Sequence, residues 1–350
     1  MLFENKVEVK TVDNNFERKN IAIASFLYKN INFSTNQNLW TIRIKKKFYT
    51  LLWKLLIKTK ILSDDPIINI KIGKKDIFMP SSHRIPFLLQ LPYYDTALSR
   101  ISYFLKKKYD ELVMIDIGAN IGDTVSLITD VVNDGHYLCV EPEQKYFQVL
   151  KYNTKDIKYV TCEKSIISVL NDNSIIGKTL NEVGGTAYFS NNEVSLNEDQ
   201  NNVSPSITTI DNLVKKYPKF YQTNLLKVDT DGYDIKVLES AASLLIEQKP
   251  IIYFEFSPWH LTNVGEDDPL SLFDKMSKIG YSQALFYDNF GYPLIYININ
   301  ESEILNQLIS YAKRKPNLYY DILMFPDFKK DDFDEFYWQE VKFFPDFKWY

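Results

Sequence analysis

Four acidic residues stand at the ends of four apolar segments. They are Asp116, Glu141, Asp229 and Glu255. In an open α/β sheet, ligands bind beyond the carboxyl ends of the strands, near the point where the strand order reverses. Burying an acid at such a place costs free energy unless the acid is hydrogen-bonded or a ligand is bound to it. The spacing therefore predicts a ligand-binding site along one edge of a sheet.

A glycine-rich turn follows the first of these segments, in "MIDIGANIGDT" at residues 114–124. Gly118 and Gly122 allow the backbone to turn tightly and to approach a ligand closely. A helix that begins near Gly122 directs free N–H groups and its positive dipole end to the same spot. Glu141 follows Gly122 by 19 positions, where an acid accepts hydrogen bonds from the vicinal hydroxyls of a ribose. A dinucleotide and S-adenosylmethionine both fit this pattern.

Two residues near the turn favour S-adenosylmethionine over a dinucleotide. Asn120 stands in place of a glycine, so the close passage of a pyrophosphate is less favourable. Asp116 would repel the diphosphate of a dinucleotide, but it would accept hydrogen bonds from the cationic methionine end of S-adenosylmethionine. The helix N-terminus would then hold the methionine carboxylate instead of a phosphate.

The elements that must position these residues alternate along the chain. Alternating strand-like and helical segments imply βαβ units, right-handed crossovers and a largely parallel sheet covered on both faces. The strands are expected at 112–117, 136–141, 157–162, 224–229, 251–256, 282–287 and 318–325, and the helices at 94–108, 122–132, 143–154, 207–217, 232–247 and 268–279. Residues 67–79 have the pattern of a hairpin. Residues 164–206 form an over-long connection, typical of a lid, a binding loop or a disordered segment.

The composition is that of a globular protein with one large domain plus appendages, or with two small domains. The net charge of −4 over 350 residues argues against wholesale nucleic-acid binding, although residues 1–60 are basic. Two cysteines, Cys139 and Cys162, indicate a reducing compartment without a disulfide framework. We find no signal-peptide pattern and no apolar stretch of the ~18 residues that a membrane span needs. A cytoplasmic location is therefore expected.

Residues 39–62 have the periodicity of a basic amphipathic helix. Its apolar positions are Trp40, Ile44, Phe48, Leu51, Leu52 and Leu55, with Lys45, Lys46, Lys47, Lys54 and Lys58 between them. We expect this helix to dock on its own domain or on a second subunit, which would make a homo-oligomer. Peripheral contact with an anionic membrane, at its inner face, is the second interpretation. Nucleic acid is the third and least favoured.

Four motifs occur in a characteristic order: "VMIDIGANIGDTVSLI", "YLCVEPEQKYFQVLKYN", "LLKVDTDGYDIKVLESA" and "PIIYFEFSP". Over roughly residues 80–325 the chain resembles the FkbM family of S-adenosylmethionine-dependent methyltransferases. The resemblance implies an α/β fold of the class I methyltransferase (Rossmann-like) type, with a seven-stranded, mostly parallel sheet, one antiparallel strand near the end and helices on both faces. It also implies O-methylation, often of sugar or polyketide hydroxyls. The cofactor pocket that it implies is lined by Asp116, Gly118, Asn120, Gly122 and Glu141.

The resemblance divides the chain into three predicted parts. Residues 1–62 are a basic N-terminal extension with the amphipathic helix, 63–330 are the FkbM-like domain, and 331–350 are an aromatic-rich C-terminal tail. The Asp-Thr-Asp-Gly stretch at 229–232 departs from the family's commoner Asp-Val-Glu-Gly pattern but keeps both acids. The ends of the chain lie outside the resemblance.

Methyl transfer to a sugar hydroxyl requires a base or a metal, because a hydroxyl is a poor nucleophile. Asp229, Asp231 and Glu255 lie at or just beyond adjacent strand ends, and His260 follows in "SPWHL". We expect one of these four residues to be the general base. A divalent cation held by the three acids is an alternative. Each acid also has a structural interpretation, since Asp231 would cap a helix well and Glu255 could pair with a lysine.

The predicted function is S-adenosylmethionine-dependent O-methylation of a sugar hydroxyl in a polysaccharide or glycoconjugate. Two alternatives come from other classes. The Asp-x-Asp at 229–231 resembles the metal motif of glycosyltransferases that use nucleotide sugars, but that interpretation leaves the 118–122 turn and Glu141 without a role. A non-catalytic scaffold that binds S-adenosylmethionine is the other, and intact acids at four strand ends argue against it.

Overall fold

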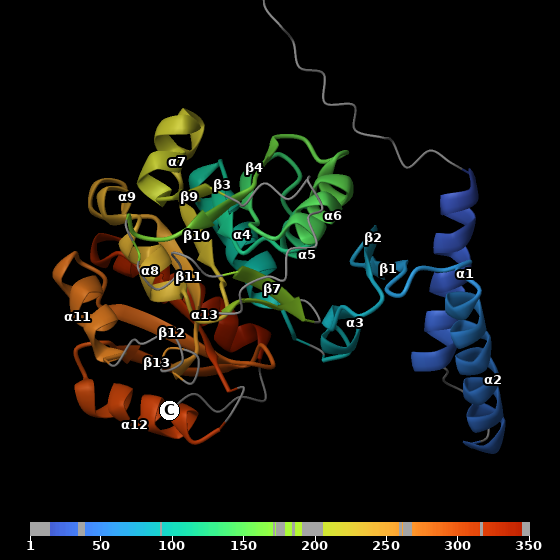
Figure 1. The fold of residues 1–350 in the computed structure, drawn as a ribbon. Coiled ribbons are helices and arrows are strands. Elements are labelled where there is room, and N and C mark those ends of the chain that lie inside the picture. Colours follow the sequence, from blue (N-terminus) through green and yellow to red (C-terminus); the bar gives the residue numbers. More distant parts are fainter. Residues whose placement is uncertain are drawn as a thin grey trace, which may run out of the picture. The chain divides into compact units, whose positions relative to one another are not determined.

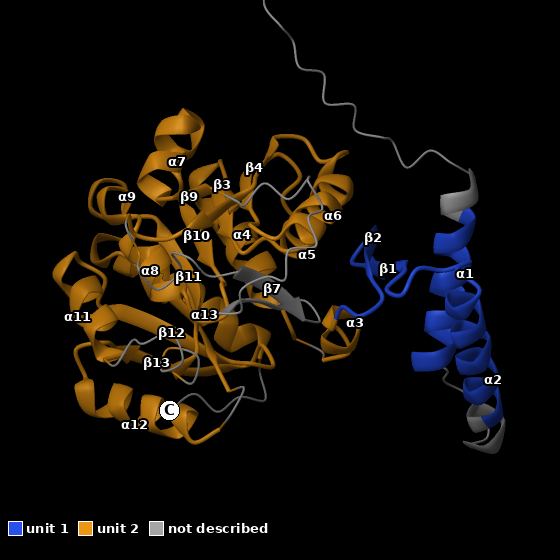
Figure 2. Cartoon of the chain, in the orientation of Figure 1, with its two compact units in different colours: residues 1–83 blue, residues 84–350 orange. Residues whose placement is uncertain are grey.

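The structure is a computed structural model that describes residues 15–33, 39–91, 93–170, 172, 179–183, 186–190, 206–258, 261, 268–315 and 318–344. The chain divides into two compact units, residues 1–83 and residues 84–350 (Figure 2). The domain boundaries predicted after residues 62 and 330 stay predictions.

The first unit combines two helices with a β-hairpin. The helices are α1 (Asn15–Asn32) and α2 (Leu39–Lys58), and the antiparallel strands are β1 (Ile67–Ile72) and β2 (Lys75–Pro80). The hairpin turns at Gly73, whose φ of +57° lies in the left-handed region. Helix α1 contacts β1, where the Asn69 amide donates to Ser25 Oγ at 2.7 Å. The predicted hairpin and amphipathic helix are both present. No helix in the described ranges is long and apolar enough to cross a membrane.

The second unit is built on an eight-stranded sheet in the order β13-β12-β14-β11-β10-β3-β4-β5. Its strands are β3 (Val113–Ile117), β4 (His136–Val140), β5 (Val160–Glu163), β10 (Leu225–Val228), β11 (Ile251–Phe256), β12 (Gln283–Asp288), β13 (Pro293–Asn298) and β14 (Tyr320–Phe325). Strand β14 runs antiparallel to both β11 and β12. This is the predicted class I methyltransferase fold, with one strand more than the seven expected. Strand β13 is the extra one, and it pairs antiparallel with β12 across a hairpin.

Helices cover both faces of this sheet (Figure 1). Alternate strand residues face opposite ways, so Ile115 lies in one buried cluster and Met114 in the other. The Ile115 side is covered by α7 (Ile210–Lys216), α8 (Asp234–Glu239), α9 (Ala242–Glu247), α11 (Leu270–Lys278) and α12 (Ser302–Lys313). The Met114 side is covered by α4 (Thr96–Tyr109), α5 (Asp123–Ile128), α6 (Gln144–Thr154) and α13 (Lys330–Phe343). The βαβ prediction is thereby confirmed.

Helix α13 occupies much of the segment predicted as an aromatic tail. Phe333 and Phe336 are fully buried, and Glu340 forms an ion pair with Arg100 of α4 at 2.6 Å. The Tyr287 hydroxyl donates to the same carboxylate at 3.0 Å.

The long 164–206 connection contains β6 (Ser165–Ile167), which pairs in parallel with β9 (Ser206–Thr208), and the antiparallel strands β7 (Thr179–Val183) and β8 (Thr186–Ser190). Residues 171, 173–178, 184–185 and 191–205 of the connection lie outside the described residues, so the lid expected there stays a prediction. Short helical turns complete the unit: α3 (Ile85–Leu88), η1 (Pro218–Gln222) and η2 (Asp327–Lys329).

Candidate active site

The turn after β3 closes tightly on its neighbouring strands. The amides of Gly118 and Ala119 both donate to the Val140 carbonyl at 3.0 Å. Gly118 has a φ of +78°, and a Cβ added there would lie 1.8 Å from the Asp229 carbonyl oxygen. Only glycine fits this position, because the turn lies directly against the backbone that leaves β10. Gly122, with a φ of +84°, then begins the short helix α5.

Glu141 is held in place by the backbone on both sides of its carboxylate. Its Oε2 accepts from the Asn120 amide at 2.9 Å, and its Oε1 accepts from the Glu143 amide at 2.8 Å. The side chain is 4% exposed, and burial raises its pKa to about 7 against the effect of these two amides. A carboxylate oxygen has two acceptor sites, so one remains on each oxygen. The geometry suits recognition of two vicinal hydroxyls.

Lys227 is a central residue of the site that the sequence analysis missed. It lies in β10 with 3% exposure, and its Nζ is 3.0 Å from Asp116 Oδ1 and 3.4 Å from Asp229 Oδ2. The same ammonium donates to the Gly118 carbonyl at 3.1 Å. Burial alone would lower the pKa of Lys227, but the two carboxylates outweigh it and raise the pKa well above its usual value. One cation therefore joins β3, the glycine turn and the end of β10.

Asp116 retains hydrogen-bonding capacity in this arrangement. Apart from the Lys227 ion pair, neither of its carboxylate oxygens has a partner among the described residues. Its exposure of only 1% separates it from solvent, whereas the Asp229 side chain is 49% exposed. Of the two acids on Lys227, Asp229 is thus the one that an entering ligand meets first.

The loop after β10 shows which acid has the structural role. Asp234 accepts from the Thr230 amide at 3.0 Å and from the Gly232 amide at 3.1 Å. The stabilising contacts that the sequence suggested for Asp231 are thus made by Asp234, and burial raises the Asp234 pKa to about 7. Asp231 is half-buried with a φ of +52°. Burial, together with the charges of Asp229 and Asp234, raises its pKa well above the usual value.

Glu255 lies near the carboxyl end of β11, opposite Asp321 of the antiparallel strand β14. It is 8% exposed, and burial followed by the charges of Asp229 and Asp231 raises its pKa well above the usual value. His260, the fourth predicted base, lies outside the described residues. The structure thus places Asp229, Asp231 and Glu255 within electrostatic reach of one another.

Two further acids, Asp95 and Asp123, lie within electrostatic reach of this cluster. Asp95 precedes α4 with a φ of +56°, and burial, followed by the charges of Asp123 and Asp229, raises its pKa to about 8. Asp123 lies in the first turn of α5, where burial raises its pKa to about 6. Because α5 carries this carboxylate at its start, the structure gives no support to binding of the methionine carboxylate there.

The described acids of this cluster are not arranged as metal ligands. Within the described ranges, no group of three or more histidine, cysteine, aspartate or glutamate side chains is arranged to hold a metal ion. Asp229 is instead engaged with Lys227. The divalent cation proposed as an alternative, which would need Asp229, Asp231 and Glu255 together, has no support from this part of the chain.

The raised pKa values predict that the ligand-free protein loses stability as the pH rises. The carboxyls of Asp123, Glu141 and Asp234 have pKa values of about 6, 7 and 7 in the folded state, above their ordinary values of 3.8, 4.5 and 3.8. At a pH between the ordinary pKa and the folded-state pKa of a carboxyl, the folded state holds a proton that the unfolded chain has released. The free energy of unfolding therefore falls as the pH rises. We expect the melting temperature to drop by several degrees from pH 5 to pH 8 in thermal scans at constant ionic strength.

Asp123→Asn provides the control for this prediction, because it removes one of the raised pKa values without changing the size of the side chain. The variant should show a shallower decline above pH 5. A melting temperature that stays level or rises towards pH 8 would contradict the assignment of these acids as buried and destabilising.

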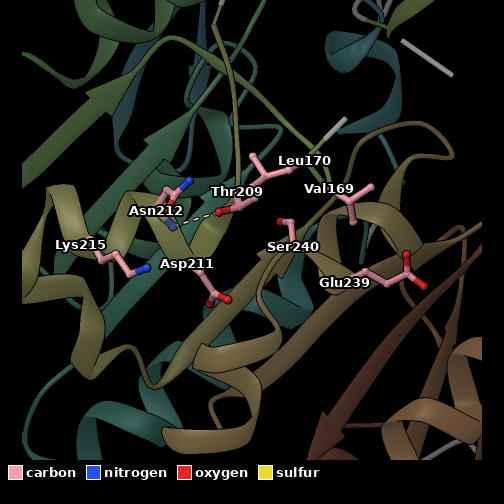
Figure 3. Close-up of a pocket in the computed structure, with 8 residues that line it drawn as sticks. All are labelled: Val169, Leu170, Thr209, Asp211, Asn212, Lys215, Glu239 and Ser240. Atoms are coloured by element: carbon pink, nitrogen blue, oxygen red, sulfur yellow. Dashed lines mark hydrogen bonds between the residues drawn. The ribbon is translucent and has the colours of Figure 1, made fainter. Parts of the chain in front are cut away.

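An open pocket of about 340 Å³ lies elsewhere in the second unit (Figure 3). None of the predicted site residues lines it. Its polar side chains already serve local structure: Thr209 accepts from the Asn212 amide at 3.0 Å, and Asp211 accepts from the Ser243 and Leu244 amides. The remaining lining residues are Val169, Leu170, Lys215, Glu239 and Ser240. We assign no role to this pocket.

The chain is similar to known methyltransferases. Residues 116–282 match the family described as "Methyltransferase FkbM domain". Similar solved structures include the METTL16 methyltransferase domain, at 10% identity over 93% of this chain and 96% of that one, with a TM-score of 0.37. The plantazolicin methyltransferase BpumL in complex with SAH is 8% identical over 89% of this chain and 97% of that one, with a TM-score of 0.33.

A methyltransferase FkbM from Methylobacillus flagellatus KT is 10% identical over 88% of this chain and 59% of that one, with a TM-score of 0.31. Because these TM-scores lie below 0.5, the assignment depends on the family match and the strand order instead. No curated protein sequence matches the chain.

Proposed function

Since the chain belongs to the FkbM family of S-adenosylmethionine-dependent methyltransferases, we propose that it methylates a hydroxyl of a sugar in a polysaccharide or glycoconjugate. The donor and the reaction type follow from the family. The acceptor is our proposal, and the chemistry of the carboxylates around Asp229 supports it.

The observation that carries the proposal is the set of acids with raised pKa values beside the glycine turn. A hydroxyl must lose its proton as it attacks, and a base works best when its pKa lies near the working pH. Burial and the repulsion between neighbouring carboxylates raise the pKa values of Asp231 and Glu255, and they raise the pKa of Asp95 to about 8. Ordinary surface carboxylates, with pKa values near 4, are much weaker bases.

The described residues fit S-adenosylmethionine by their donor and acceptor set. Glu141 presents the two remaining acceptor sites of its fixed carboxylate to the ribose hydroxyls. The turn at Gly118 brings the backbone close, and the exposed Asp229 carboxylate suits the cationic methionine end. The cofactor supplies the electrophilic methyl group. The protein's own residues orient the acceptor, exclude water and remove the hydroxyl proton.

Asp231 is our first candidate for the general base, because it is half-buried and lies beyond the strand edge, whereas Glu255 is almost fully buried. The glycosyltransferase alternative needs a metal site that the described residues do not form. The family match also favours a methyltransferase over a non-catalytic scaffold. Free cysteines at 139 and 162 support the cytoplasm as the place of this reaction.

The test is transfer of labelled methyl from S-adenosylmethionine to fractionated cell glycans, followed by mass spectrometry of the labelled fraction. We expect label in carbohydrate, as an ether that survives mild alkali, and slower transfer by Glu141→Ala when S-adenosylmethionine is below saturation, because the variant binds the cofactor more weakly. Label that enters protein, lipid or nucleic acid instead would refute the sugar acceptor while leaving the family assignment intact.

A further inference from the structure

Helix α2 presents a row of large apolar side chains to solvent. Ile44, Phe48, Leu51 and Leu55 are 49%, 60%, 69% and 53% exposed. Their spacing of four, three and four residues places them on one face of the helix, along a length of ~16 Å. Isolated exposed apolar residues are common, but a continuous row marks a surface that binds something.

Lysines border this row on both sides. At about 100° of rotation per residue, Lys47, Lys54 and Lys58 fall along one edge and Lys45 along the other. All four are exposed, and the twenty residues of α2 contain no acid. We call this surface, with its apolar row and its lysine borders, the basic face of α2.

The opposite side of α2 is engaged within its own unit. Tyr49 packs edge-on against Phe26 of α1, with ring centroids 5.7 Å apart. The side chains of Tyr49, Trp53 and Leu56 are half-buried, in contrast to the apolar row. Helix α1 therefore covers one side of α2 and leaves the basic face open.

We propose that the basic face of α2 binds the surface of an anionic lipid bilayer. Apolar side chains of this kind insert at the boundary between headgroups and acyl chains, and lysine stems extend sideways so that their ammonium groups meet the phosphates. Lysines on both edges and the absence of acids match a uniformly anionic plane.

A second copy of the chain fits this face less well. A twofold dimer made through it would bring the lysine edges of two identical helices together, and like charges in contact are unfavourable. The membrane proposal concerns a surface outside the catalytic unit and does not depend on the sugar acceptor.

The experiment measures binding of the full-length protein to sedimented vesicles of phosphatidylcholine with and without phosphatidylglycerol. Binding is expected with the anionic vesicles, and it should weaken as the salt concentration rises. The double variant Phe48→Gln/Leu51→Gln should bind on the order of tenfold or more weakly, since two large side chains no longer insert.

Phe328→Gln/Leu294→Gln is the matched control, because these two apolar residues of the second unit are also exposed, at 69% and 46%. It should bind vesicles as the wild type does. Far-ultraviolet circular dichroism spectra equal to that of the wild type would show that both double variants remain folded. Equal vesicle binding by Phe48→Gln/Leu51→Gln and the wild type, or no binding of the wild type to anionic vesicles, would overturn the proposal. In the second case, a dimer that the same variant dissociates in light scattering would identify another copy as the occupant.

Discussion

Replacing Lys227 with methionine is expected to lower the free energy of unfolding by ~3–5 kcal/mol, because the substitution leaves a buried carboxylate without its partner. Asp116 is 1% exposed, and among the described residues Lys227 is its ion-pair partner. Methionine fills a similar volume without the charge, so the loss would report electrostatics more than packing. Urea unfolding, followed by circular dichroism at pH 8, measures the effect.

Two comparisons make this result specific. Lys275→Met removes an exposed ion pair with Glu239 and should change stability by less than ~1 kcal/mol. Adding Asp116→Asn to Lys227→Met removes the orphaned charge and should restore part of the loss. If Lys227→Met were as mild as Lys275→Met, the ammonium would not be the centre of this site.

Gly118→Ala should be the second most damaging single change. The added methyl group would lie 1.8 Å from the Asp229 carbonyl oxygen and 2.9 Å from the carbonyl carbon, and the φ of +78° is itself strained for alanine. Backbone cannot move aside as a side chain can. We expect a loss of ~3 kcal/mol or more in the free energy of unfolding, together with loss of S-adenosylhomocysteine binding in calorimetry.

Gly280→Ala separates the clash with the Asp229 carbonyl from the strain of the left-handed backbone. Gly280 has a similar φ of +86°, but its added Cβ would meet side-chain atoms and no backbone: Lys249 Nζ at 3.0 Å and Asp327 Oδ2 at 3.8 Å. This control should lose only the ~1–2 kcal/mol of left-handed strain and keep its affinity for S-adenosylhomocysteine. Equal effects of the two substitutions would mean that the close approach of Gly118 to Asp229 has no special importance.

Local patterns in the sequence predicted most of the sheet. The strand predicted at 112–117 is β3 at Val113–Ile117, and the one predicted at 251–256 is β11 with the same bounds. Such segments are recognisable because a strand buried on both faces is continuously apolar and a polar residue marks its end. The extra strand β13 was missed, although its run Leu294-Ile295-Tyr296-Ile297 is of the apolar, β-branched and aromatic kind that indicates a strand.

Contacts between distant segments could not be predicted in the same way. Lys227 is a single charge within an apolar strand, and its role depends on the parallel pairing that places Lys227 beside Asp116. The sequence does show one signal, because lysine is almost never fully buried unless it is paired. Similarly, both Asp231 and Asp234 could stabilise the loop before α8, and only the backbone conformation selects Asp234.

The central claim is that the carboxylate of Glu141 receives the ribose of S-adenosylmethionine, and isothermal titration calorimetry of the wild type and Glu141→Ala tests it most directly. We expect the substitution to weaken binding of the cofactor and of S-adenosylhomocysteine by ~1–3 kcal/mol, the cost of a lost charged hydrogen bond. Glu111→Ala, at the opposite end of β3 from the turn, should leave the affinity unchanged. Unchanged affinity in Glu141→Ala would contradict the account.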